Sequence, residues 1–99
     1  MAELTPKQRQ YLKGISHGEK PVIHIGKNGI DDGVIASINK ALDDHELIKV
    51  SVLENSDLDR KEAAQDICDA VKAEKVQVLG RKITIYRRNK KEPKIVLPK

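Results

Sequence analysis

Residues 23–34 read Ile-His-Ile-Gly-Lys-Asn-Gly-Ile-Asp-Asp-Gly-Val, an apolar run followed by a glycine-bounded loop and a helix-like segment. Gly26 and Gly29 enclose Lys27 and Asn28. Glycine lets the backbone approach a partner closely because it has no Cβ. A helix that begins just after such a loop directs free N–H groups to the same place. The stretch predicts a strand, a loop and a helix, with a nucleic-acid phosphate as the first candidate for the loop's ligand.

Several kinds of loop share this pattern. An ordinary strand-to-helix turn with Gly29 at positive φ explains it equally simply. A Walker A loop is excluded because the spacing differs and no Ser or Thr follows Lys27. A KH loop joins two helices, whereas this one follows a predicted strand. Asp31 and Asp32 lie in the first turn of the next helix, where capping its free N–H groups would also repel a phosphate. We expect instead that their side chains turn away, while Lys27 and the loop backbone meet the ligand.

Size and composition favour one soluble domain spanning residues 1–99. The chain is 38% hydrophobic and 34% charged, and Tyr11 and Tyr86 are its only aromatic residues. No apolar stretch approaches the roughly 20 residues of a membrane helix, and the N-terminus lacks an apolar signal segment. The single cysteine, Cys68, excludes an intramolecular disulfide. We therefore expect a cytoplasmic protein with no membrane partner.

Charge is strongly segregated along the chain. Residues 1–27 carry a net charge of +3, residues 28–80 carry −6, and residues 81–99 carry +7. If both basic ends fold onto one side, the molecule has a basic face and an acidic back, which orients a protein on a polyanion. The alternative is a merely solvated surface with a charged tail.

Capping residues and hydrophobic periodicity predict the elements. The first helix begins with Thr5 as N-cap, Pro6 at its first position and Gln8 in a capping box, and it stops at Gly18. The remaining segments follow apolar periods of 3.6 or 2. They are strands at 20–25 and 46–53, helices from 31 or 32 to 42 and from 59 to 72, and β-rich runs at 76–79 and 83–87.

The order α-β-α-β-α-β-β predicts an α/β fold with a four-stranded mixed sheet. Strand–helix–strand repeats give parallel pairs with right-handed crossovers, and Gly80 suits a tight hairpin between the last two strands. The basic tail, about residues 88–99, contains an apolar run at 95–97 that is either a short edge segment or unpaired.

The sequence offers no nucleophile–base pair for catalysis. His17, His24 and His45 lack zinc-ligand spacing. Cys68 falls on the apolar stripe of the third predicted helix, where a thiol behaves as a small hydrophobic group. We expect no enzyme activity, no cofactor and no metal. The absence of Phe and Trp also excludes a base-stacking sheet of the RRM kind.

Four ordered segments resemble a known family. They are Leu-Thr-Pro-Lys-Gln-Arg-Gln-Tyr-Leu-Lys-Gly at 4–14, Lys-Pro-Val at 20–22 leading into Ile-Gly-Lys-Asn-Gly-Ile at 25–30, His-Glu-Leu-Ile-Lys-Val at 45–50, and Val-Gln-Val-Leu-Gly-Arg at 76–81 followed by Ile-Tyr-Arg at 85–87. Together they are similar to the bacterial YhbY-like proteins, which are stand-alone CRM domains (chloroplast RNA splicing and ribosome maturation).

The resemblance implies a fold like the C-terminal domain of translation initiation factor 3. It also implies binding to precursor ribosomal RNA of the large subunit during ribosome assembly. The family's Gly-x-x-Gly loop maps onto residues 26–29, and its basic first helix onto Lys7, Arg9 and Lys13. The full set of predicted RNA-binding residues is Lys7, Arg9, Lys13, Lys20, Gly26, Lys27, Asn28, Gly29, Arg81, Lys82, Arg87 and Arg88.

Two other functions remain open at this point. A protein-binding adaptor would use the acidic helices, with Asp59, Glu62 and Asp66, to dock a ribosomal protein or an assembly enzyme. A small phosphoryl or nucleotide enzyme would use the glycine loop, but it needs a base and a metal-ligand set that the sequence does not offer. We expect a monomer in either case.

Overall fold

The computed structural model describes residues 4–27, 29–53, 59–89 and 91–98. Its element order confirms the predicted α/β class and the sequence α-β-α-β-α-β-β. The elements are α1 (Pro6–Ser16), β1 (Ile23–Ile25), α2 (Asp32–His45), β2 (Leu47–Val52), α3 (Arg60–Val71), β3 (Glu74–Leu79) and β4 (Lys82–Tyr86). The predicted first strand is too long at its start, and the second helix runs three residues beyond the predicted end.

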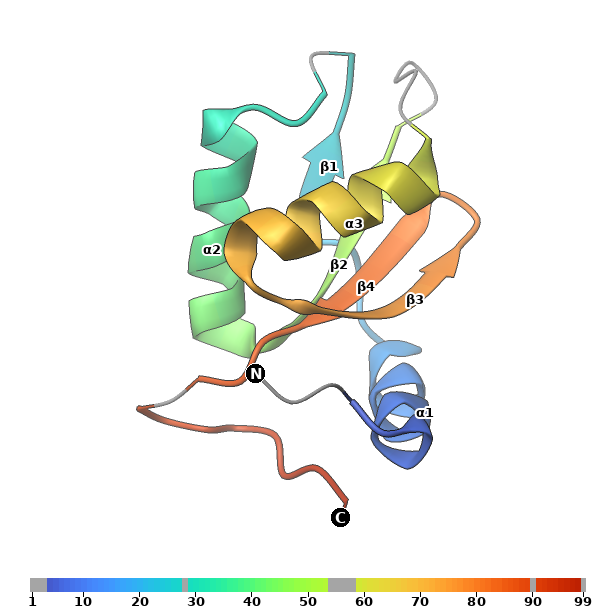
Figure 1. Ribbon diagram of the computed structural model, residues 1–99, viewed down its shortest axis with the longest axis vertical. Coiled ribbons are helices and arrows are strands. Elements are labelled where there is room, and N and C mark those ends of the chain that lie inside the picture. The colour runs from blue at the N-terminus through green and yellow to red at the C-terminus, as the bar shows by residue number, and fades with distance from the viewer. Residues whose placement is uncertain (1–3, 28, 54–58, 90, 99) are drawn as a thin grey trace.

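The four strands form the predicted mixed sheet, in the order β1-β2-β4-β3. β1 and β2 are parallel, whereas β4 is antiparallel to both of its neighbours. Because β2 and β3 are not adjacent, the chain crosses over through α3. Figure 1 shows α2 and α3 on one face of the sheet, while the chain between α1 and β1 passes behind it.

Two apolar clusters hold the layers together. The larger one lies between the sheet and the helix pair α2 and α3, and it includes the fully buried Ile25, Val50 and Ile83. The smaller cluster lies on the other face and joins Leu12 of α1 to Leu47 and Tyr86. α1 therefore packs against one end of the face that α2 and α3 leave open.

The predicted helix starts are confirmed where they can be checked. The Gln8 N–H donates to Thr5 Oγ1 at 3.1 Å, and the Thr5 N–H donates to Gln8 Oε1 at 3.0 Å, which completes the capping box. Asp31 caps α2 by accepting from the Val34 N–H at 2.8 Å. Such caps satisfy backbone donors that the first helical turn leaves free.

The β3–β4 connection is the tight hairpin that Gly80 predicted. Gly80 has φ of +59°, a conformation that a side chain disfavours. The sheet register shifts between Lys75 and Gln77, which is a bulge in β3. β4 ends at Tyr86, so Arg87 lies outside the strand to which the sequence assigned it.

The tail forms no strand within residues 91–98, but it is bound to the domain. The Glu46 side chain is fully buried and accepts hydrogen bonds from the N–H groups of Asn89 and Ile95, both at 2.8 Å, and of Lys94. Ile95 and Leu97 pack against the smaller apolar cluster described above, which we call the α1 cluster. Apolar side chains and one carboxylate therefore position a segment that the sequence left as either an edge or a free end.

Candidate nucleic-acid interface

One end of the sheet brings three of the predicted segments together. The Leu53 N–H donates to the Ile25 carbonyl at 2.8 Å, and the Val52 N–H donates to the Arg81 carbonyl at 2.7 Å. The ends of β1 and β2 therefore lie beside the β3–β4 turn. The glycine loop continues outward from β1 at this end (Figure 1). Exposed cationic side chains at this end include Lys27 of the glycine loop and Arg81 and Lys82 of the β3–β4 hairpin.

The loop itself is a tight turn. The Gly29 N–H donates to the Gly26 carbonyl at 3.1 Å, and Gly29 has φ of +69°. Lys27 is exposed, while Asn28 lies outside the described residues. Asp31 occupies the Val34 N–H, so this part of the α2 start is already satisfied. The expectation that both Asp side chains turn away is wrong for Asp31, and a phosphate at this end would rely on Lys27 and the loop backbone.

The basic residues of α1 lie at the opposite end of the sheet (Figure 1). Lys7 is exposed and Lys13 is half-buried. Arg9 is also half-buried, and its Nε–H donates to the Lys75 carbonyl at 3.4 Å, which ties it to β3. The loop and α1 lie near opposite ends of the longest axis of the domain (Figure 1), so they form two basic groups rather than one cluster.

The open face of the sheet connects these two groups. Core residues of the four strands share one side through the pairs Ile23–Val50, Val50–Ile83 and Ile83–Val78. Because strand side chains alternate, their neighbours line the other face. They form two cross-strand rows. His24–Ser51–Lys82–Leu79 is the more exposed row, whereas Lys49–Thr84–Gln77 is partly covered, with Thr84 buried at its centre.

Two residues of this face were missing from the predicted site. Lys49 is half-buried at the centre of β2, and His24 is exposed on β1. The alternation of Ile48, Val50 and Val52 in the sequence already placed Lys49 away from the core. That Lys49 belongs with the other basic residues follows only from the strand register, which sets it beside Thr84 and near Lys82. Lys20 is exposed in the connection between α1 and β1. This connection contacts β2 through the Val22 N–H, which donates to the Lys49 carbonyl at 3.0 Å.

Arg87 belongs to the interior of the domain, contrary to its predicted role as a phosphate contact. Its Nη1 donates to Asn39 Oδ1 at 2.7 Å and to the Val71 carbonyl at 2.8 Å. Its Nη2 donates to the Asn39 carbonyl at 3.0 Å and to Asp43 Oδ1 at 2.9 Å. The side chain is 20% exposed. Arg87 therefore joins α2 to the end of α3, and we remove it from the candidate interface.

Replacing Arg87 by alanine should lower the free energy of unfolding by about 2 kcal/mol, because it leaves three partly buried acceptors unpaired. The Asp43 partner adds little, since its carboxylate is 72% exposed. Urea unfolding at pH 7 measures the change. Arg88→Ala is the matched control, because Arg88 is exposed and should change stability by less than about 0.5 kcal/mol. Equal effects of the two substitutions would contradict the internal role of Arg87.

The described titratable groups do not suggest catalysis. Cys68 is buried, and this burial raises the pKa of its thiol to about 11, so the reactive thiolate is scarce at neutral pH. Burial also raises the pKa of Tyr86, whose hydroxyl has no hydrogen-bond partner among the described residues. Among residues 4–27, 29–53, 59–89 and 91–98, no three His, Cys, Asp or Glu side chains are grouped as metal ligands. No helix in these same ranges is long and apolar enough to cross a membrane.

Comparison with known proteins identifies close relatives along the chain. Residues 4–87 match the CRS1/YhbY (CRM) domain. A Bacillus subtilis protein named probable RNA-binding protein YqeI is 37% identical over 95 residues, which cover 96% of this chain and 99% of that protein. A Haemophilus influenzae protein named RNA-binding protein is 44% identical over 103 residues, which cover 100% of this chain and 99% of that protein.

A solved structure shows the same fold. The solution structure of a Staphylococcus aureus protein, described as a candidate RNA-binding protein, superposes with a TM-score of 0.81 and 44% sequence identity. The superposition covers 96% of this chain and 99% of that one. The arrangement of helices and sheet described above is therefore shared by an experimentally determined relative.

Proposed function

Because the chain belongs to the CRS1/YhbY (CRM) domain family, we propose that it binds RNA through the open face of its sheet and the two basic groups at the ends of that face. The observation that carries this proposal is the pair of cross-strand rows, polar except for Leu79, that crosses the sheet between α1 and the glycine loop. Lys49 and Lys82 lie in these rows, so positive charge continues across the face.

Phosphate contacts would position the RNA, and the sheet would read mainly its backbone and shape. The proposed contacts are Lys7, Arg9, Lys13, Lys20, His24, Gly26, Lys27, Asn28, Gly29, Lys49, Arg81 and Lys82. Arg88 is exposed beside the α2 and α3 ends and stays in the set as a peripheral contact.

The opposite face supports the same orientation. α2 and α3 cover that side of the sheet (Figure 1), and they carry the exposed acidic residues Asp43, Asp44, Glu62, Asp66 and Asp69. Negative charge there disfavours a polyanion and directs it to the basic side. This face is also where an adaptor would dock a protein, so RNA and protein would bind on different sides of one domain.

The RNA that we propose as partner is precursor ribosomal RNA of the large subunit, bound during ribosome assembly in the bacterial cytoplasm. The family resemblance supports this choice, and the relatives' names support RNA as the class of ligand. The protein would act as a monomeric binding module that changes no covalent bond, with ribosomal proteins as further partners.

Crosslinking in cells, followed by sequencing of the attached RNA, tests this partner. We expect precursor large-subunit RNA to be enriched over its share of total RNA. A parallel sample with Lys13→Gln and Lys27→Gln should lose most crosslinks, since two phosphate contacts are removed. Crosslinks spread over messenger RNA in proportion to abundance would contradict the ribosomal assignment and leave a generic RNA-binding protein.

A further inference from the structure

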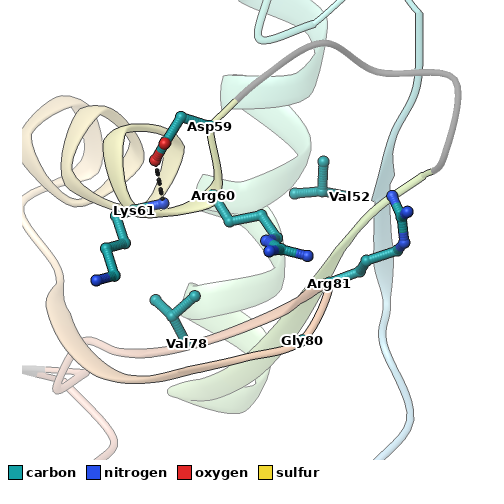
Figure 2. A pocket seen from close by; sticks show the side chains of 7 residues that line it. All are labelled: Val52, Asp59, Arg60, Lys61, Val78, Gly80 and Arg81. Carbon is teal, nitrogen blue, oxygen red and sulfur yellow. Dashed lines mark hydrogen bonds between the residues drawn. The ribbon is translucent and has the colours of Figure 1, made fainter.

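A cavity of about 420 Å³ lies at the edge of the helical side of the sheet, between the start of α3 and the β3–β4 turn (Figure 2). Its lining comes from three elements that are distant in sequence. The residues are Val52 of β2, Asp59, Arg60 and Lys61 at the start of α3, Val78 of β3, and Gly80 and Arg81 of the turn. No motif in the sequence predicted this site, because only the fold brings α3 to the hairpin.

Three cationic side chains line the cavity. In Figure 2 the Arg60 side chain extends from α3 toward the turn that carries Arg81, and Lys61 extends on the other side of Val78. Among the described residues of the lining, Asp59 is the acidic one. Its Oδ1 accepts from the backbone N–H groups of Lys61 and Glu62 at 2.9 and 3.1 Å, so it caps α3. The described lining residues therefore carry a net charge of +2.

The cavity combines this charge with an apolar surface. Val52 and Val78 belong to the sheet side of the lining. Val52 is buried and half-buried Val78 packs against the main core, so Val78 supplies more of the apolar surface. A volume of 420 Å³ lies within the usual range of small-ligand sites, about 300–1,000 Å³, and exceeds the needs of a phosphate alone. Arginine binds phosphate through paired N–H groups and also stacks on planar rings. Phosphate, sugar and base together suit this lining.

We propose that the cavity binds one nucleotide of the RNA, with its phosphate between Arg60 and Arg81, Lys61 adding positive charge on the other side of Val78, and its sugar or base over Val52 and Val78. This inference rests on the proposed RNA binding and adds α3 to the interface. The path from the glycine loop to the cavity is short. The Val52 N–H donates to the Arg81 carbonyl, and the Leu53 N–H donates to the Ile25 carbonyl beside the glycine loop. An RNA strand that leaves the loop reaches the cavity along this edge.

NMR of the full chain, labelled at its backbone amides and its valine methyl groups, tests the nucleotide site. On addition of a single-stranded RNA oligonucleotide, the Val52 and Val78 methyl signals should shift, whereas those of Val71, at the far end of α3, should not. Arg60→Gln with Lys61→Gln should abolish these shifts and weaken binding about tenfold. The control pair, Lys40→Gln with Lys72→Gln, removes the same charge from exposed positions of α2 and the end of α3.

The possible outcomes separate this site from the general function. Shifts at Gly26 and Gly29 without shifts at Val52 and Val78 would overturn the nucleotide site and leave the RNA interface intact. Equal binding by the two double variants would overturn it as well. Uridine 5′-monophosphate that shifts the valines as strongly as the oligonucleotide at equal concentration would assign the cavity to free nucleotides. RNA that shifts no signal at all would overturn the proposed function together with this inference.

Discussion

Replacing Glu46 by alanine should lower the free energy of unfolding by about 3–4 kcal/mol and release the tail from the domain. Three backbone N–H groups, from Asn89, Lys94 and Ile95, lose their acceptor at once. Each hydrogen bond to a charged group contributes about 1.5–3 kcal/mol, and the three are not additive because they share one carboxylate. Removing it also frees Ile95 and Leu97 from their contacts with the α1 cluster.

Urea unfolding at pH 7 measures the stability change, and limited proteolysis of the tail measures its release. Asp66→Ala is the control, since Asp66 is exposed on α3 and should change stability by less than about 0.5 kcal/mol. A Glu46→Ala protein within that same margin, with a protease-resistant tail, would contradict the anchoring role.

Glu46→Gly separates the carboxylate from the backbone at this position. Glu46 has φ of +63°, which is strained for a residue with a Cβ. Glycine relieves that strain while still removing the acceptor, so Glu46→Gly should be about 1 kcal/mol more stable than Glu46→Ala. If the two variants are equally stable, the backbone at residue 46 has relaxed in the alanine protein.

The parts of the fold that sequence reasoning found depend on local signals. Thr5 and Gln8 form a capping box within one helical turn, and Gly80 marks a turn between neighbouring strands. Alternating Ile48, Val50 and Val52 fixes which side of β2 meets the core. Such signals involve residues a few positions apart, so periodicity and capping chemistry suffice to read them.

The parts that sequence reasoning missed depend on contacts between distant residues. Glu46 bonds to N–H groups 43–49 positions away, and Arg87 bonds to Asn39, 48 positions away. By sequence alone, Arg87 counts among the predicted RNA-binding residues, and the Glu46 side chain has no predicted role. The same limit applies to the site, because grouping basic residues by segment could not show that α1 and the glycine loop lie at opposite ends of the sheet, nor that Arg60 faces the hairpin.

Removing one lysine from each end of the proposed interface should weaken RNA binding roughly thirtyfold at 0.1 M salt. Lys13 is on α1 and Lys27 is in the glycine loop, so their effects should be independent. Each phosphate contact adds about 0.7–0.9 to the slope of log affinity against log salt, and at 0.1 M this is about a sixfold effect per contact. The slope of the double variant Lys13→Gln, Lys27→Gln should therefore fall by about 1.4–1.8.

Neither lysine is needed for folding on the contacts described. Lys27 is exposed in the loop, and the Lys13 contact that contributes to structure is its carbonyl, which accepts from the Ser16 hydroxyl at 2.9 Å. Unfolding midpoints of the double variant and of the wild-type chain should agree, so a loss of binding reports on the interface itself. The matched control is again Lys40→Gln with Lys72→Gln, on the opposite, helical side of the sheet.

The most direct test is therefore the affinity of these three proteins for a transcript of precursor large-subunit ribosomal RNA, measured between about 0.05 and 0.3 M salt. The interface predicts that Lys13→Gln with Lys27→Gln loses roughly thirtyfold in affinity and about 1.4–1.8 in salt slope, while the control pair stays close to wild type. Equal affinity and equal slope for the two double variants would contradict RNA binding through the open face of the sheet.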